Sequence, residues 1–350
     1  MSTQPGHVSP GEHVDAGLHA TLRFATGVTL AFLLCEVMQW APTFLAPVLA
    51  VVLLGNLPMR PTPKVALVLV AAMLAAALYA FVLTSLFRGT PLVLFGLIAL
   101  SLFLSFHAML SGRPNLPFML LLICLATIPV VAMIAPAQGS ALPIAMVRGI
   151  ALALAMIGLV YLPWPQVPLP TPKPPASAHQ ATPLMRALLS TFVVLPVMLV
   201  YLLFGLADVL PVLVTTVMLV INFDLQSGRS QALAMILGNF VGGLLGMLLH
   251  TALLTTPSLT FLGLLLFVVL LGFGQRIVAG GPKAGVAVVT CNAMLIILSS
   301  AIASGSGSLA LWIARVFQFA LAGAFAVGMM HLVWHQALAR RAAPPEPAVH

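Results

Sequence analysis

The chain has 350 residues, of which 61% are hydrophobic and only 6% are charged, and its mean hydropathy is +1.16. A soluble domain carries about 25% charged residues, and its surface-to-volume ratio exposes too much surface to hide this many apolar side chains. The net charge of +8 comes from Lys and Arg residues that stand singly along the chain, which argues against nucleic acid as a partner. Composition therefore predicts an integral membrane protein embedded in a lipid bilayer.

Residues 1–21 lack the basic region, short apolar core and small-residue cleavage site of a secretory signal peptide, so we expect a cytosolic tail. Apolar runs long enough to cross a hydrocarbon core of ~30 Å then follow one another. In the first half, the expected spans are residues 22–40, 42–58, 64–87, 91–110, 116–134 and 143–163.

A proline-rich stretch at residues 164–184 follows, and we expect it to form a semi-rigid cytosolic linker in the polyproline II conformation. A second set of apolar runs comes after it, before a cytosolic tail at residues 336–350. The expected spans are residues 185–205, 208–223, 229–254, 256–274, 281–303 and 309–334. The total is about twelve transmembrane helices, with no loop long enough for a soluble domain.

The basic residues test this arrangement, because cytosolic loops carry an excess of Lys and Arg. With the N-terminus inside, the basic residues in loops and at the ends of spans, Arg23 among them, fall on the inner side, except for Arg88. Both termini are therefore predicted to be cytosolic.

The two halves also resemble each other. Cys124 and Cys291 are separated by the same number of residues as Arg148 and Arg315. The matched pairs, in chain order, are Pro47 and Pro211, Gly112 and Gly280, Cys124 and Cys291, and Arg148 and Arg315. An even number of spans in each copy predicts two parallel six-helix repeats, at residues 22–163 and 185–335.

Polar residues inside the spans are the candidates for function, because burying them in lipid is costly. Arg148 and Arg315 occupy matching positions, and we expect them to face a central cavity and bind an anionic substrate. Gln318 shares the helical face of Arg315, and Asn292 is a further substrate-binding candidate. The alternative is that each arginine locks helices together.

Two acidic residues, Glu36 and Asp208, are predicted at depths similar to those of the arginines, and an ion pair between Glu36 and Arg148 is geometrically possible. They are the candidates for proton coupling. Prolines within spans and charges at an inner turn suggest a hinge or gate. These gating or hinge candidates are Pro47, Pro211, Asp224 and Arg229.

No cofactor, metal site or enzyme activity is expected. Cys35, Cys124 and Cys291 stand in apolar runs without a C-x-x-C pair, so we expect them to be buried, small hydrophobic side chains. His331 and His335 are four residues apart but have no acidic or Cys residue near them in sequence, so interfacial histidines are favoured over a metal site. A phosphate-binding loop, a dinucleotide fingerprint, a serine elbow and an H-E-x-x-H motif are all absent from the sequence.

Gly238, Gly242 and Gly246 recur every fourth residue and predict a close approach of two helices. The segment from Gly228-Arg229-Ser230 into these glycines resembles the Arg-Gly-Gly helix of the fusaric-acid-resistance and aromatic acid exporter family. The resemblance covers about residues 22–334. It departs from the family in two respects: only the proline linker stands where typical members carry a large cytosolic domain, and the first half lacks the glycine ladder. The chain thus resembles a compact, membrane-only branch.

The resemblance implies export of small, often aromatic, carboxylic acids. We therefore expect a proton-coupled secondary efflux transporter in a bacterial inner membrane, working with a periplasmic adaptor of the HlyD type and compatible with a homo-oligomer. The alternatives are a passive anion channel and a non-transporting membrane scaffold for an adaptor or envelope complex.

Overall fold

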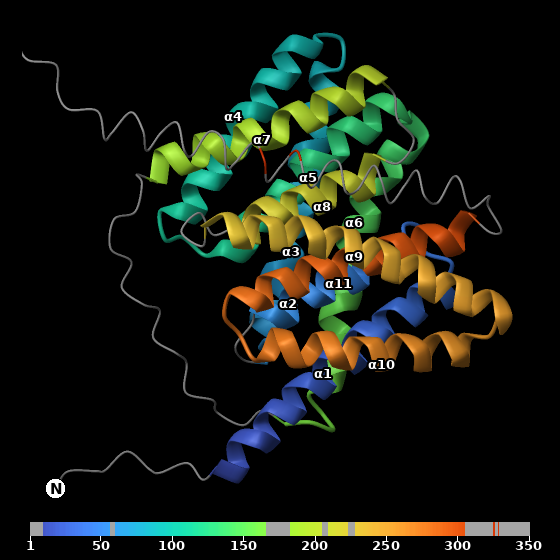
Figure 1. Cartoon of the computed structure of the whole chain (residues 1–350). Helices are drawn as coiled ribbons and strands as arrows, with labels where there is room; N and C mark the ends of the chain where they lie inside the picture. Colours follow the sequence, from blue (N-terminus) through green and yellow to red (C-terminus); the bar gives the residue numbers. More distant parts are fainter. Residues whose placement is uncertain are drawn as a thin grey trace, which may run out of the picture. The chain divides into compact units, whose positions relative to one another are not determined.

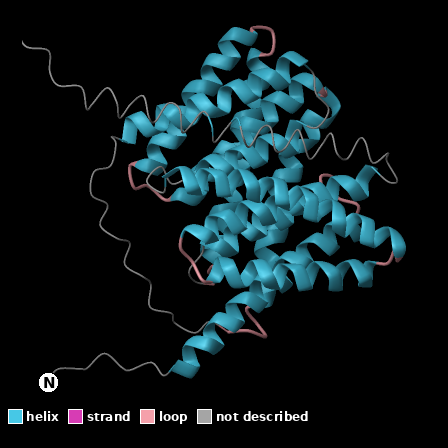
Figure 2. Cartoon of the chain, viewed as in Figure 1, coloured by secondary structure: helices cyan, strands magenta, loops and turns pink. Residues whose placement is uncertain are grey.

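The computed structural model describes residues 10–56, 60–165, 183–204, 209–222 and 228–304, together with Phe325 and Gly328. These residues form helices joined by short turns, and no strand occurs among them (Figures 1 and 2). The helices are α1 (Pro10–Val37), α2 (Leu45–Asn56), α3 (Pro63–Phe87), α4 (Pro91–Leu110), α5 (Asn115–Ile134), α6 (Pro136–Val160), α7 (Pro183–Phe204), α8 (Val209–Asn222), α9 (Gly228–Thr255), α10 (Leu259–Val278) and α11 (Pro282–Ser304). In this part of the chain, 9 helices are long and apolar enough to cross a membrane. The chain is a multi-pass membrane protein, as its composition predicts.

Local sequence explains where these helices begin and end. Pro91 occupies the first turn of α4, where a missing N–H costs nothing, and Ser258 caps α10 by accepting a 3.1 Å hydrogen bond from the Phe261 N–H. The α4–α5 turn contains Gly112 at φ +84°, and the α10–α11 turn contains Gly280 at φ +71°. Glycine adopts this left-handed conformation without steric cost. The two turns that the sequence pairs therefore share a backbone feature.

Two helix starts differ from the prediction by more than three residues. α1 begins at Pro10, inside the predicted cytosolic tail, because a proline at the first helical position favours a helical start. α6 begins at Pro136 and continues through Pro143, where the sequence suggested a boundary. The predicted span at residues 309–334 lies outside the described residues, apart from Phe325 and Gly328. Most of the proline linker and the C-terminal tail also lie outside them.

The helices form two compact units, each assembled from separate stretches of chain. Unit 1 contains α1, α2, α10 and α11, with the start of α3, most of α6 and the end of α9. Unit 2 contains α4, α5, α7 and α8, with the remaining parts of α3, α6 and α9. Each unit therefore takes helices from both halves of the sequence, while the division into two repeats stays a prediction.

Within unit 1, α10 lies against α1 through glycines that remove side-chain bulk. A Cβ added to Gly263 would lie 3.0 Å from Leu33 Cδ1, and one added to Gly274 would lie 3.2 Å from the Thr21 carbonyl oxygen. Both distances are tighter than ordinary van der Waals contact. These two glycines, eleven residues apart, keep the two helices close across about three turns of α10.

The end of α9 approaches α11 even more closely. A Cβ on Gly242 would clash with the Thr290 carbonyl oxygen, and a Cβ on Gly246 would lie 2.7 Å from the Met294 carbonyl oxygen. The backbones are therefore in direct contact, as in small-residue packing between membrane helices. This contact confirms the close packing predicted from the glycine spacing for Gly242 and Gly246.

Unit 2 is organised around α5, which contacts α4, α7 and α8. In the membrane-spanning stretch of α5, 67% is buried inside the protein. This makes α5 a core helix rather than a lipid-facing one. Cys124, at its middle, is fully buried and donates a 3.6 Å S–H contact to the Met73 sulfur. This environment fits the predicted role of Cys124 as a small apolar side chain.

Candidate functional site

Several polar groups gather where α1 turns into α2, at one end of unit 1. The turn is shaped by backbone bonds from Met38 to Leu34 and from Trp40 to Cys35. Gln39 adopts φ +51°, and its side-chain amide donates a 2.8 Å hydrogen bond to the Glu36 carbonyl oxygen, which supports this uncommon conformation. The name α1–α2 corner is used below for Glu36, Trp40, Thr43, Arg148 and Ser299.

Arg148 reaches the corner from α6. Its guanidinium carbon lies 4.4 Å from the centroid of the Trp40 ring, and its Nη2 donates a 3.3 Å hydrogen bond to the Ala41 carbonyl oxygen. A cation over an aromatic face gains about 0.5–2 kcal/mol, depending on desolvation. The bond to Ala41 uses only one of several guanidinium N–H groups. Arg148 is therefore anchored and still has donors to offer.

Glu36 lies at the same corner, yet it does not form the ion pair with Arg148 that its depth allowed. The Trp40 ring and the Ala41 carbonyl oxygen engage the guanidinium instead. The half-buried Glu36 carboxyl group is hydrogen-bonded to Thr43, and its Oε1 is buried with no hydrogen-bond partner. Both charged groups nevertheless lie within electrostatic range of the Cys35 thiol.

Thr43 continues the polar contacts to α11, because its hydroxyl is hydrogen-bonded to the Ser299 hydroxyl. Asn292 lies on the same face of α11 as Ser299, two helical turns earlier. Val288, one turn before Asn292, approaches Gly55 of α2. This face of α11 therefore follows α2 from one contact to the other, with Asn292 between them.

Asn292 is only 1% exposed, and neither its Nδ2 nor its Oδ1 has a hydrogen-bond partner. A buried polar group left without a partner costs about 1–3 kcal/mol. Unsatisfied groups of this kind are rare in folded proteins and call for a physical explanation. Among the described residues, nothing uses the hydrogen-bonding groups of the Asn292 amide.

The other predicted site residues divide into three groups. Pro47 lies in the first turn of α2, within unit 1. Pro211 lies in α8 and Arg229 in α9, and only the backbone of these two residues is described. Outside the described residues are Arg315, Gln318, Asp208, Asp224 and the paired histidines His331 and His335. The structure brings Glu36, Arg148, Asn292 and Pro47 into one unit.

Arg23 is an important residue that sequence reasoning assigned only to inner-side charge. Its side chain is 7% exposed. Nη1 donates hydrogen bonds of 3.0 Å and 3.1 Å to the carbonyl oxygens of Trp164 and Pro165, and the guanidinium carbon lies 4.7 Å from the Tyr161 ring centroid. The aromatic residues at the end of the predicted sixth span were the sequence signal that could have indicated this role of Arg23.

Arg23 and Arg148 together tie α1 to α6 at both ends. Arg23 of α1 binds the chain just after α6, while Arg148 of α6 binds the chain just after α1. The two helices therefore run antiparallel, and each arginine combines an aromatic ring with a backbone carbonyl oxygen. These two sites are called the arginine clamps below.

Among the described residues, no group of three or more His, Cys, Asp or Glu side chains is placed to share a metal ion. A family described as "Protein of unknown function (DUF2955)" matches residues 20–160, a stretch that includes Arg23, Glu36 and Arg148. No curated protein and no solved structure matches the chain. The matched family description names no substrate and no exporter.

Proposed function

We propose that this protein is a proton-coupled secondary transporter that exports small organic acids, including aromatic ones, across a bacterial inner membrane. The observation that supports it most directly is the α1–α2 corner. It holds an arginine free of an ion pair, a carboxyl oxygen without a partner and, further along α11, a buried amide without a partner. An organic acid supplies the carboxylate and polar atoms that these groups lack.

In this mechanism, the unused N–H groups of Arg148 bind the substrate carboxylate through charge-assisted hydrogen bonds. Asn292 offers a donor and an acceptor to a second polar group of the substrate. Glu36 has a carboxyl oxygen free of protein partners, which proton exchange requires. The corner thus provides one group for the anion and another for the coupling proton.

The net charge of the α1–α2 corner in its substrate-bound and substrate-free states favours a fixed order of transport steps. With the substrate anion bound and Glu36 ionised, the corner carries a net negative charge; with the substrate released and Glu36 protonated, it carries a net positive charge. An inside-negative membrane potential drives the first state outward and the second inward, at about 2.3 kcal/mol per charge for each 100 mV. Export of the anion and entry of the proton are then driven in the same cycle.

The proposal includes about twelve spans in two parallel six-helix repeats, with both termini in the cytosol. It is supported by the eleven helices of the described residues, which follow the first eleven predicted spans, and by the left-handed glycines in the paired turns. A periplasmic adaptor of the HlyD type would carry the exported acid onward. Self-association is compatible with the apolar surface.

Replacing Arg148 by alanine should reduce export of radiolabelled benzoate from cells at least about tenfold, because charge-assisted hydrogen bonds of ~1.5–3 kcal/mol are lost. Export should be measured at matched protein abundance in the membrane. Arg88→Ala is the control, since Arg88 is an exposed arginine in the α3–α4 turn. Normal export by the Arg148 variant would leave the residue as a helix clamp only and would contradict its role in substrate binding.

Replacing Glu36 by glutamine preserves the shape of the side chain and removes the exchangeable charge. We expect proton-driven benzoate uptake into inverted vesicles to collapse, while benzoate binding to the purified protein changes less than about threefold, since Arg148 is retained. The measurement is uptake with and without an imposed proton gradient. Undiminished flux through the variant would identify a passive channel rather than a coupled transporter.

A further inference from the structure

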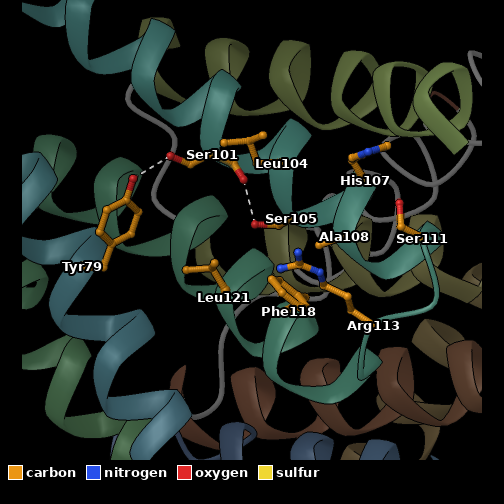
Figure 3. Close-up of a pocket in the computed structure, with 10 residues that line it drawn as sticks. All are labelled: Tyr79, Ser101, Leu104, Ser105, His107, Ala108, Ser111, Arg113, Phe118 and Leu121. Carbon is orange, nitrogen blue, oxygen red and sulfur yellow. Dashed lines mark hydrogen bonds between the residues drawn. The ribbon is translucent and has the colours of Figure 1, made fainter.

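Unit 2 contains a pocket that shares no residue with the α1–α2 corner. It has a volume of about 450 Å³ and lies between α3, α4 and α5 (Figure 3). Its apolar lining is formed by Leu104, Ala108, Phe118 and Leu121. Its polar lining is formed by Tyr79, Ser101, Ser105, His107, Ser111 and Arg113. Its volume lies within the range of about 300–1,000 Å³ that is usual for small-molecule sites.

The pocket contains a cation, Arg113, that has no acidic residue to pair with among the described residues of unit 2. Arg113 extends from the α4–α5 turn back toward the middle of the pocket (Figure 3). The whole sequence has only 6 acidic residues, and none of them lies in the described residues of unit 2. No carboxylate of that part of the chain can pair with Arg113. An anion is the natural complement to such a group.

The hydrogen bonds within the pocket show which donors remain. The Ser101 hydroxyl donates to the Leu97 carbonyl oxygen at 2.7 Å, so the Tyr79 hydroxyl must donate the 2.8 Å bond that joins it to Ser101. Ser105 donates to the Ser101 carbonyl oxygen at 2.7 Å. These three hydroxyl hydrogens are occupied. The donors left for a ligand therefore cluster near Arg113.

Two further features lie at that end of the pocket. His107 stacks on Phe103 at 6.1 Å between ring centroids, and its Nδ1 is buried without a hydrogen-bond partner. α5 begins beside Arg113 behind Pro114, with no side-chain cap on its free N–H groups. The positive end of the α5 dipole offsets the negative end of α4 at the same turn. The acidic group of a ligand thus fits best at Arg113.

The other side of the pocket opens along the apolar surface of α3 and α4. Tyr79 is 45% exposed and Leu104 is 53% exposed. Only 28% of the membrane-spanning stretch of α3, and 33% of that of α4, is buried inside the protein. In a bilayer this surface faces hydrocarbon chains. A ligand that reaches the pocket from this side must combine an apolar body with its acidic group.

We infer that this pocket binds an amphiphilic anion. Arg113 holds its carboxylate or phosphate group, and its apolar body lies against Leu104, Phe118 and Leu121. The same chemistry is found in a soluble aromatic acid and in an anionic lipid of the adjoining leaflet. This inference is independent of the proposed transport function, because it concerns only the binding of a ligand to the pocket.

The test uses the full-length protein in phosphatidylcholine nanodiscs, with Arg113→Gln compared with wild type. One arm measures binding of radiolabelled 1-naphthoate, and the other measures retention of phosphatidylglycerol by native mass spectrometry. Loss of the guanidinium should weaken binding in at least one arm by about tenfold or more, the ratio that corresponds to ~1.4 kcal/mol. Arg88→Gln is the matched control, since it removes an exposed arginine from the opposite end of the α3–α4 hairpin.

Loss confined to the naphthoate arm identifies a site for soluble acids, and loss confined to the phosphatidylglycerol arm identifies a lipid head-group site. Either result supports the inference. Ala108→Phe gives an independent check, because it fills the pocket without changing its charge and should weaken the same arm. Wild-type protein that binds neither probe, or equal affinity in the Arg113 and Arg88 variants, would overturn the inference.

Discussion

Replacing Gly242 by valine should destabilise the protein more than the other substitutions proposed for it. The added Cβ would overlap the Thr290 carbonyl oxygen of α11 and lie 2.9 Å from the Ala293 Cβ. Neither atom belongs to a flexible side-chain end, so the two helices must separate. Overpacking a well-filled core typically costs about 1–3 kcal/mol, and a clash with backbone belongs at or above the upper end.

Thermal unfolding can be measured through the exposure of the native cysteines. Cys124 and Cys291 are 0% exposed, so a thiol-reactive fluorophore reports their exposure when the detergent-solubilised protein is heated. Gly242→Val should lower the midpoint of this transition by several degrees, or prevent recovery of folded protein. Gly272→Val is the control, because Gly272 is helical and a Cβ added there would have nothing within 4 Å. Equal midpoints for the two variants would contradict the close α9–α11 packing.

Replacing Arg23 by methionine should have the second largest effect. The change keeps a long apolar stem and removes both hydrogen bonds to the carbonyl oxygens of Trp164 and Pro165. Hydrogen bonds to charged groups contribute about 1.5–3 kcal/mol each, and the lost contact with the Tyr161 ring adds about 0.5–2 kcal/mol. With partial relaxation, we expect a net loss of ~3 kcal/mol in stability.

A double-mutant cycle separates the ring contact from the hydrogen bonds. The thermal midpoints of Arg23→Met, Tyr161→Leu and the double variant should show a coupling of about 0.5–2 kcal/mol. Arg88→Met serves as the control for loss of an exposed arginine, and we expect it to change stability by less than about 0.5 kcal/mol. Additive effects of the two substitutions would show that the guanidinium gains nothing from the ring.

Most helix positions could be predicted because prolines, glycines and charges separate the apolar runs. The predicted span at residues 91–110 coincides with α4, and the span at residues 64–87 differs from α3 by one residue. The early start of α1 was missed because its first turns are polar. Hydropathy detects only the apolar part of a helix that lies in the hydrocarbon core, and the same helix can extend beyond the core into water.

For the candidate site, the sequence could predict only the depth of its residues in the membrane. Counting spans places Glu36 and Arg148 at the same level, and the structure brings both to the α1–α2 corner. The arginine clamps were not predictable, because they depend on which helices are neighbours. Arg23 and Trp164 are 141 residues apart in sequence, and Arg148 and Ala41 are 107 apart. The pairing of Tyr79 with Ser101 likewise depends on how α3 and α4 face each other.

The assembly of unit 1 from distant stretches of chain has a consequence for biosynthesis. Thr43, in the turn before α2, and Ser299 of α11 are hydrogen-bonded to each other and are 256 residues apart. At about 5–20 residues per second, the ribosome needs roughly 13–50 s to add the residues between them. For most of that interval, α1 and α2 have been made but α10 and α11 have not. The Arg23 and Arg148 clamps need only the first 165 residues, so they can hold α1 against α6 while the rest of the unit is still being made.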